Sequence, residues 1–472
     1  MVRLVDEALR APARFNLPRG LASSDVTLAD PAVGTGTFLL GVLRRIAETV
    51  EADEGAGSVP AAITDALNRL IGFELQFGPF AVAQLRLLAE LIDLVTIGKA
   101  DEADEELHKV LGATLRLYIT DTLADPDEET SWIPSSMTGI AESRREANRI
   151  KRHEAITVVL GNPPYKEKAK GLGGWVEDRG KALRAPLDDW QPPVSWGVGA
   201  HAKHLRNLYI YFWRWAAWKV FGGDPYRGGT DKTELEDWTR RKGVVCFITV
   251  AGFLNGPGFQ KMRADLRRDA DEIWVIDCSP EGHQPPQASR VFGGVQQTVC
   301  IVMASRRADV EHTTPARVRF RALPEGPRED KFKAIAGIGL DDDGWVEAPN
   351  DWRAPFLPAG AAEWVGYPAM DDLFLYNGSG VMTGRTWVIA PDAQSLKDRW
   401  ARLVKETDAV AKERLFHPHM NGDRTVTKVV REALAGHPHP ATPVSAAKAL
   451  ARPRSATPSG RSTGSGCFPT IG

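Results

Sequence analysis

The strongest constraint on the fold is an alternation, between about residues 25 and 303, of short β-branched runs with longer helical patterns. Short strands separated by helices are typical of βαβ units, whose strands pair in parallel. The sequence therefore predicts an α/β fold with a mainly parallel, twisted sheet flanked by helices. The predicted strands are Val26–Ala29, Leu70–Phe73, Leu117–Thr120, Ile156–Leu160, Val244–Val250, Ile273–Ile276 and Val299–Met303. The main predicted helices are Thr37–Val50, Pro79–Leu94, His204–Val220 and Gly258–Ala270.

A glycine-containing turn follows the first predicted strand, in the sequence DPAVGTGTFLL. The strand ends at Asp30, the turn carries Gly34 and Gly36, and a helix begins near Thr37. Glycines let the backbone bend sharply and approach a ligand closely, and a helix N-terminus presents free N–H groups. That positive helix end suits a phosphate or the carboxylate of an amino acid. An ordinary tight turn has the same pattern, so both interpretations stay open at this point.

Acidic residues end the next two predicted strands. Glu74 ends the second strand (IGFEL), and Asp121 follows the third (LYITD). In open α/β sheets, ligands bind at the carboxyl ends of the strands. A carboxylate there can accept hydrogen bonds from ribose hydroxyls or from the exocyclic amine of adenine. Each acid alone could also be a solvated strand end or a helix cap, but three such strand ends in order favour a nucleoside-containing ligand.

The fourth predicted strand runs directly into Asn162-Pro163-Pro164-Tyr165. The two prolines fix φ near −65° and hold Asn162 and the Pro163 carbonyl in a set direction. Both are hydrogen-bond acceptors and neither is a good base, a combination that suits a planar –NH₂ group whose lone pair must be freed from conjugation. Tyr165 adds a ring for stacking, worth about 1–3 kcal/mol for a base. A surface turn is the alternative, because Asn-Pro commonly starts one.

Taken in order, DPAVGTGTFL, GFEL, ITD and NPPY resemble the motifs of S-adenosylmethionine-dependent N6-adenine DNA methyltransferases of the γ order. Residues 374–392 (FLYNGSGVMTGRTWVIAPD) resemble the start of the target-recognition region in single-polypeptide type I (type ISP) restriction-modification enzymes. The likeness covers roughly residues 1–435. It implies a Rossmann-like S-adenosylmethionine-dependent methyltransferase fold with a partial C-terminal target-recognition region.

The resemblance also implies roles for individual residues. Glu74 would bind the ribose of S-adenosylmethionine, Asp121 its adenine, and Tyr165 would stack on a target adenine flipped out of double-stranded DNA. No metal is required. The implied cofactor-binding residues are Asp30, Pro31, Ala32, Gly34, Gly36, Thr37, Glu74 and Asp121. The implied catalytic residues are Asn162, Pro163, Pro164 and Tyr165, with Asn162 and the Pro163 carbonyl binding the N6 amino group.

The chain also departs from this family. In this family a Tyr-Thr-Pro or Phe-Thr-Pro element normally precedes the glycine turn, and neither occurs before Asp30 here. Type ISP enzymes also contain a nuclease and a helicase, but no GxxxxGK[ST] phosphate loop occurs in this sequence. We therefore expect a fragment or a truncated gene product. Its predicted parts are a methyltransferase catalytic domain (1–305), a partial target-recognition region (306–435) and a disordered, low-complexity tail (436–472) that contains no acidic residue.

Charge does not exclude a nucleic-acid partner. The chain has 59 Lys+Arg and 61 Asp+Glu, which rules out a uniformly basic binder but leaves room for a basic cleft. Candidate DNA contacts are Lys166, Lys168 and Lys170, beside the proposed base pocket, and Arg385 in the recognition segment. A basic cluster at 144–152 is a further candidate, and a solvated face is the alternative for each of these groups.

Several classes of protein are excluded or disfavoured. The four cysteines lack CxxC spacing, no run is long enough to span a membrane, and the N-terminus lacks the apolar stretch of a signal peptide. We expect a cytoplasmic protein with no membrane partner, and further restriction-modification components are possible partners. The competing functions are a protein glutamine N5-methyltransferase, an inactive remnant that binds only DNA or cofactor, and a dinucleotide-dependent oxidoreductase.

Overall fold

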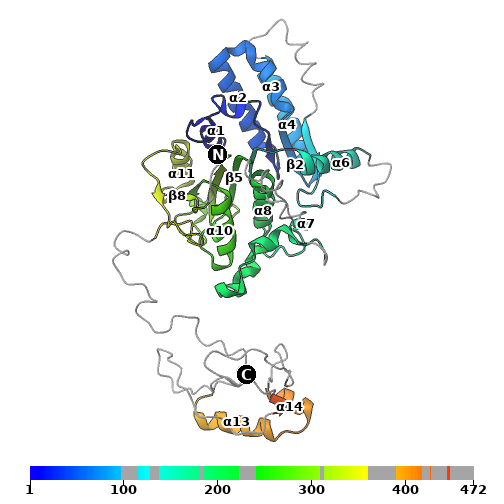
Figure 1. The fold of residues 1–472 in the computed structure, drawn as a ribbon, viewed down its shortest axis with the longest axis vertical. Coiled ribbons are helices and arrows are strands. Elements are labelled where there is room, and N and C mark those ends of the chain that lie inside the picture. Colours follow the sequence, from blue (N-terminus) through cyan, green and yellow to red (C-terminus); the bar gives the residue numbers. More distant parts are fainter. Residues whose placement is uncertain are drawn as a thin grey trace. The chain divides into compact units, whose positions relative to one another are not determined.

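The computed structural model describes residues 1–96, 115–127, 138–180, 184–222, 241–308, 313–359, 390–416, 426 and 444–446. The chain forms two compact units, Met1–Val365 and Gly366–Gly472, each of which is described by itself (Figure 1). Arg385 and all of the predicted tail except 444–446 lie outside the described residues.

A nine-stranded sheet forms the centre of the first unit, in the order β3-β2-β1-β4-β5-β7-β6-β8-β9. From β3 to β5 all neighbours are parallel, and β7 lies antiparallel between β5 and β6. The seven strands predicted from the sequence are all present, each with ends within three residues of the prediction. The strands are β1 (Leu28–Asp30), β2 (Leu70–Glu74), β3 (Arg116–Ile119), β4 (Val158–Gly161), β5 (Gly243–Val250), β6 (Glu272–Asp277), β7 (Val299–Arg306), β8 (Arg317–Ala322) and β9 (Val346–Glu347).

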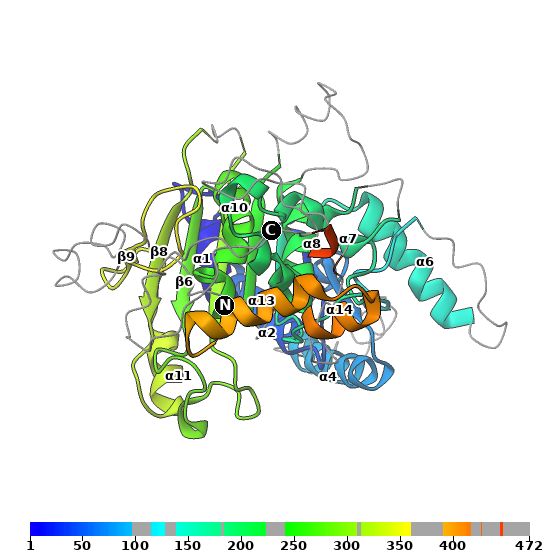
Figure 2. The same cartoon turned by 90° about the horizontal axis from the view of Figure 1, so that it is seen from below.

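Helices cover both faces of this sheet, as the predicted α/β fold class requires. One core cluster joins α1, α2, α3 and α4 to one face, and a second joins α6, α7, α8 and α10 to the other (Figure 1). Figure 2 shows α6 reaching outward from the rest of the unit. The helices are α1 (Val2–Arg10), α2 (Thr37–Glu54), α3 (Val59–Leu67), α4 (Phe77–Thr96), α6 (Thr138–His153), α7 (Gly174–Glu177), α8 (Leu208–Phe221), α10 (Gln260–Asp269) and α11 (Arg328–Ala336).

Helix α8 is buried on all sides, from Tyr209 to Phe221. Its aromatic residues pack in the core, as the sequence predicts, with Trp213 edge-on to Phe247 of β5 at 5.2 Å between ring centroids. A helix that is apolar all round belongs in a core rather than on a surface. Its buried Arg214 is compensated by the Pro186 carbonyl at 2.8 Å and by Asp189.

The sheet continues past residue 305. β8 pairs in parallel with β6, β9 pairs with β8, and Arg14 near the N-terminus forms ion pairs with Glu272 of β6 and with Asp341. Residues 306–365 therefore belong to the same compact unit as the N-terminal helix. The predicted boundary at 305 between a catalytic domain and a recognition region stays a prediction.

The second unit contains two described α-helices, α13 (Ala393–Lys405) and α14 (Ala409–Phe416). Asp392 caps the first of them by accepting a hydrogen bond from the Ser395 N–H at 2.7 Å, which satisfies one of the free donors at a helix start. The two helices share a small apolar cluster, made by Trp400, Leu403, Phe416 and Val426.

Candidate functional site

The glycine turn after β1 packs against the carboxyl end of β2. The N–H of Val33 donates to the Phe73 carbonyl at 3.0 Å, and the N–H of Gly34 donates to Glu74 Oε2 at 2.9 Å. Gly34 and Gly36 have φ of +56° and +82°, a region that side chains rarely adopt. The backbone conformation thus explains both glycines, and it leaves the first N–H groups of α2 facing the carboxyl edge of the sheet.

The carboxyl group of Asp30 is fully buried, and one of its oxygens accepts no hydrogen bond from a described residue. Its Oδ1 accepts a hydrogen bond from the Ala32 N–H at 3.0 Å, whereas Oδ2 has no partner among the described residues. Burial, together with the nearby Glu74 carboxylate, raises the pKa of Asp30 to about 7. Unsatisfied buried oxygens are rare in folded proteins, so Oδ2 suggests a missing ligand donor.

The end of β4 approaches Asp30 closely because it is a glycine. A Cβ added to Gly161 would lie 2.8 Å from Asp30 Oδ1, which is too close for any side chain. Asn162 follows directly, so the predicted target-binding tetrapeptide begins beside the buried acid of the predicted cofactor site.

The two predicted strand-end acids, Glu74 and Asp121, also lie at this edge. Glu74 accepts one backbone N–H on each oxygen, from Gly34 and from Gln76, the latter at 2.8 Å. The Thr120 N–H donates to the Glu74 carbonyl at 2.9 Å, which joins the ends of β2 and β3. Asp121 is half-buried and accepts from the Leu123 N–H at 2.9 Å.

A further hydrogen bond closes this arrangement. The buried Thr122 hydroxyl donates to the Pro31 carbonyl at 2.6 Å, so the loop after β3 is tied to the loop after β1. The structure therefore brings the predicted cofactor-binding residues of three strands together at one edge.

Sequence reasoning missed a guanidinium at the start of α2. Arg86 of α4 donates from Nη1 to the Thr35 carbonyl at 2.7 Å and to the hydroxyls of Thr35 and Thr37 at 3.0 and 3.3 Å. Arg86 lies far along the chain from the turn, and no local pattern marks it. It adds positive charge where the helix N-terminus is already positive, a combination that favours an anionic ligand group.

The Asn162-Pro163-Pro164-Tyr165 segment leaves β4 at the same edge. The Tyr165 hydroxyl donates to Asn162 Oδ1 at 2.5 Å, and its ring centroid lies 6.3 Å from that of Phe292. Burial raises the pKa of the Tyr165 hydroxyl well above its usual range, so it stays a neutral donor. Pro163 is buried, and Pro164 is exposed.

The three lysines after Tyr165 present exposed side chains from a fixed backbone. The Leu208 N–H donates to the Lys166 carbonyl at 2.8 Å, and the Lys168 N–H donates to Asn207 Oδ1 at 3.0 Å. Lys166, Lys168 and Lys170 are all exposed. Asn207 and Leu208, at the start of α8, therefore hold the backbone of Lys166 and Lys168 beside the tetrapeptide.

The predicted basic cluster at 144–152 lies on α6 and is less available for DNA than its sequence indicates. Arg149 pairs with Glu146 at 2.6 Å and Arg152 with Asp127 at 3.4 Å. Lys151 is fully buried, so its inclusion among the possible DNA contacts is wrong. The helical period places it on the inner face of α6, one residue after the buried Ile150.

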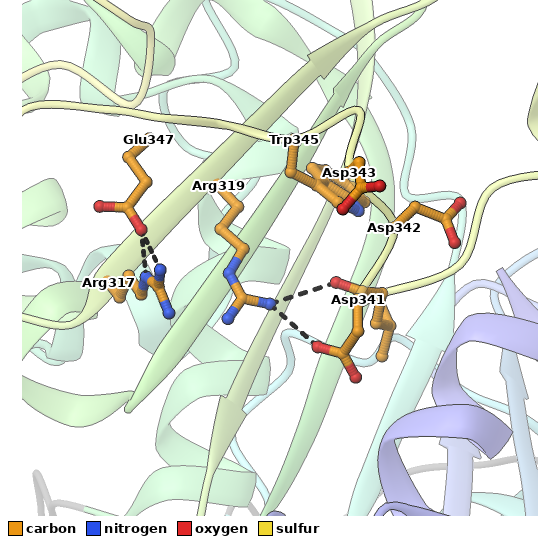
Figure 3. Close-up of a pocket in the computed structure, with 8 residues that line it drawn as sticks. Arg317, Arg319, Asp341, Asp342, Asp343, Trp345 and Glu347 are labelled. Atoms are coloured by element: carbon orange, nitrogen blue, oxygen red, sulfur yellow. Dashed lines mark hydrogen bonds and ion pairs between the residues drawn. The ribbon is translucent and has the colours of Figure 1, made fainter.

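A surface pocket of about 320 Å³ lies elsewhere, beside β8 and β9 (Figure 3). Its arginines are already neutralised, because Arg317 pairs with Glu347, and Arg319 pairs with Asp341 at 3.2 Å. None of the predicted site residues lines it. We therefore regard this ion-pair network as part of the sheet edge.

Within the described part of the chain, no group of three or more His, Cys, Asp or Glu residues could hold a metal ion. No helix of the described residues is long and apolar enough to cross a membrane.

The strand order, with β7 antiparallel between β5 and β6, and the glycine turn after β1 are those of a Rossmann-like methyltransferase fold, which confirms the predicted fold class. Residues 372–453, within the second unit, match the family model of the type ISP C-terminal specificity domain. No curated protein sequence matches the chain.

Two solved structures share this fold over most of the chain. One is the ATP-dependent type ISP restriction-modification enzyme LlaBIII bound to DNA (20% identity, TM-score 0.56), matched over 86% of this chain and 25% of that chain. The other is a nuclease-deletion mutant of the type ISP enzyme LlaGI with a DNA substrate mimic (16% identity, TM-score 0.56), matched over 91% and 35%. The present chain thus spans about a quarter to a third of these enzymes, and its predicted resemblance to a methylase-like part of a type ISP enzyme is confirmed.

Proposed function

We propose that this chain transfers a methyl group from S-adenosylmethionine to N6 of an adenine flipped out of double-stranded DNA, as part of a restriction-modification system. The observation that carries this proposal is the convergence of Asp30, Glu74, Asp121 and Asn162 at the carboxyl ends of four adjacent strands, β1 to β4. Ligands of open α/β sheets bind at that edge.

The residues present fit the chemistry of the cofactor. The orphaned Asp30 Oδ2 suits its α-ammonium group, and Arg86 with the start of α2 suits its carboxylate. Each Glu74 oxygen accepts one backbone N–H and keeps a lone pair for a ribose hydroxyl, while the Asp121 carboxylate suits the adenine amine. When bound, S-adenosylmethionine supplies an electrophilic methyl group on its sulfonium sulfur.

The target side needs acceptors rather than a base. Asn162 Oδ1 uses one lone pair for the Tyr165 hydroxyl and keeps the other for an N6–H, and the Pro163 carbonyl can accept the second N6–H. Directing both N6–H bonds at these oxygens would free the nitrogen lone pair from the ring. That pair could then form the bond to the methyl carbon while the bond from this carbon to sulfur breaks and its electron pair returns to the sulfur. The acceleration then comes from positioning and electrostatics, and the displaced proton leaves to water.

DNA as the substrate is supported by charge and by the relatives. The exposed Lys166, Lys168 and Lys170 lie beside the tetrapeptide, where phosphate contacts are needed. Both type ISP structures were determined with DNA or a DNA mimic, and the second unit matches a specificity domain. Arg385, a further proposed DNA contact, belongs to that matched region.

Tritiated S-adenosylmethionine tests the proposal with the full chain and unmethylated double-stranded DNA. We expect label in the DNA, and no label when Asn162→Ala replaces the wild type. Label on glutamine of a protein substrate would support the glutamine N5-methyltransferase instead. Cofactor binding without any transfer would support an inactive remnant, and either result would overturn the proposed activity.

A further inference from the structure

The ammonium group of Lys151 lies buried directly beneath the loop that carries Asp121. Its Nζ donates to the Asp121 carbonyl at 2.5 Å and to the Thr120 hydroxyl at 3.2 Å. It also lies 5.8 Å from the ring centroid of Phe73, the residue before Glu74. Lys151 therefore contacts the ends of both strands whose acids form the nucleoside half of the proposed cofactor site.

Burial makes a charged side chain at position 151 energetically costly. The side chain of Lys151 is completely buried, and it forms no ion pair with any described residue. Buried ammonium groups are costly without a carboxylate partner, so packing alone does not explain a lysine here. Burial above all, opposed by Asp121 and Asp125 in the loop after β3 and assisted by Arg144 on the same helix, lowers the pKa of Lys151 to about 8.

A second buried lysine holds the backbone of the α6 segment that carries Lys151. Lys219 of α8 donates to the carbonyls of Ile150 and Lys151, at 3.1 and 2.7 Å, at the carboxyl end of α6. A cation there satisfies helix carbonyls that otherwise lack partners. The contacts thus run from α8 through the end of α6 to the backbone of Asp121.

Lys151 is one of several supports that together determine the orientation of Asp121. Its carbonyl is held by Lys151, its Oδ1 by the Leu123 N–H, and the next residue by the bond from the Thr122 hydroxyl to Pro31. These contacts leave the loop little freedom to redirect the carboxylate.

We propose that Lys151 is a positioning residue that aims the Asp121 carboxylate at the exocyclic amine of the cofactor's adenine, and so makes cofactor binding selective for adenine. The inference rests on the proposed function, since it requires the cofactor to bind at this edge of the sheet. Lys151 does not touch the cofactor, and it acts through the backbone of Asp121.

The test compares two ligands by calorimetry on the full chain: S-adenosylhomocysteine and its analogue with hydrogen in place of the exocyclic amine. The wild type should prefer the natural ligand by about tenfold or more, as expected for one hydrogen bond to a charged group. Lys151→Met, which keeps an unbranched apolar stem and removes the ammonium group, should reduce that preference to about twofold, as should Asp121→Ala. Lys331→Met is the control, because Lys331 is an equally buried lysine on α11 that lies away from the proposed site, and it should keep the wild-type preference. Unlike Lys151, Lys331 has a carboxylate partner, Glu281 at 2.8 Å, besides the Cys278 carbonyl.

The outcomes separate this inference from the proposed function. If the wild type does not bind S-adenosylhomocysteine, the proposed function fails. If Asp121→Ala removes the preference but Lys151→Met keeps it, or if Lys151→Met weakens both ligands equally, the positioning role is overturned. Should Lys151→Met not fold, Thr120→Val removes one of the lysine's two acceptors, and an unchanged preference in that variant would also count against the role.

The pH profile gives a readout that a purely structural role would not change. Because the charged form of Lys151 holds the Asp121 carbonyl, the wild-type preference for the amine should fall as the pH rises through about 8. Burial also lowers the pKa of Lys219, which contacts the Lys151 carbonyl, to about 7, but this group is common to the wild type and to Lys151→Arg, so the difference between them reports Lys151. Lys151→Arg stays charged over this range and should keep the preference constant. A wild-type preference that does not change between pH 7 and 9.5 would contradict the proposal.

Discussion

The two sides of the candidate site are built differently. On the cofactor side, the ends of β1, β2 and β3 are joined directly to one another by hydrogen bonds of 2.6–3.0 Å, from Val33 to Phe73, Gly34 to Glu74, Thr120 to Glu74 and Thr122 to Pro31. On the target side, the Tyr165 hydroxyl donates to Asn162, three residues earlier in the same segment. The Gln297 side chain donates to the Tyr165 carbonyl over a long distance of 3.4 Å. The strand ends on the proposed cofactor side are thus held by their own hydrogen bonds. Under the proposed function, the target side would receive a base that must first leave the DNA stack.

The largest effect is expected for Asn162→Ala, which should reduce methyl transfer without changing cofactor binding. Asn162→Ala removes the acceptor proposed for the target amine, which also holds the Tyr165 hydroxyl, so methyl transfer should fall by about 10²–10³-fold or more. The dissociation constant for S-adenosylmethionine should stay within about threefold, because Asn162 makes none of the contacts that join β1, β2 and β3. Single-turnover transfer and calorimetry on the same preparation measure both values. A parallel loss of the two would contradict the division of roles.

The converse variant, Glu74→Ala, should act on cofactor binding. It removes the acceptors proposed for the ribose hydroxyls and also the partner of the Gly34 N–H. Two hydrogen bonds to a carboxylate suggest an increase of about 100-fold in the cofactor dissociation constant. Glu90→Ala, which breaks only the pair of Glu90 with the exposed Arg44, is the control and should change binding by less than about twofold. Equal effects of the two variants would remove Glu74 from the site.

Asp30 should make cofactor binding depend on pH. Its pKa is raised to about 7, so it is neutral in acid and ionised above neutrality. Because the ionised form attracts the cofactor's ammonium group, affinity should rise by up to about tenfold per pH unit below 7 and level off above it. The same ionisation should lower the free energy of unfolding as the pH rises from about 4 to about 7 in the absence of ligand. Asp30→Asn should flatten both profiles, and an unchanged binding profile would show that another group titrates.

The smallest expected effects belong to the exposed lysines. Replacing Lys166, Lys168 or Lys170 by alanine removes at most one phosphate contact, so each should reduce the slope of log affinity for DNA against log salt by about 0.9. Cofactor affinity should not change. Lys333→Ala on α11 is a matched control, since that side chain is exposed but distant in the sequence from the tetrapeptide. Salt slopes identical in all four variants would place the DNA elsewhere.

Much of the fold could be predicted from the sequence because local patterns determine it. Short, mostly apolar runs mark each of β1 to β7, and the glycine turn marks the start of α2. The insertion of β7 between β5 and β6 is a long-range pairing that no local pattern reveals. β8 was missed because Arg317, Arg319 and Arg321 alternate with its apolar residues, which suits an ion-paired strand near the sheet edge but does not resemble a core strand.

The sequence predicted the candidate-site residues that lie at strand ends, but not those that reach the site from helices. Asp30, Glu74, Asp121 and Asn162 were found because strand ends at one edge must converge. Arg86 and Lys151 were not assigned to the site, because they reach it from helices and only tertiary packing brings them there. The charge-rich sequence of α6 indicates a solvated surface, yet its helical period turns Lys151 inward.

The most direct test of the central claim is the identity of the methylated nucleoside. Unmethylated double-stranded DNA would be incubated with the full chain and S-adenosylmethionine, digested to nucleosides and analysed by mass spectrometry, beside an Asn162→Ala control. The account predicts N6-methyladenine with the wild type and none above background with the variant. Methylated cytosine, or N6-methyladenine at equal levels with Asn162→Ala, would contradict it.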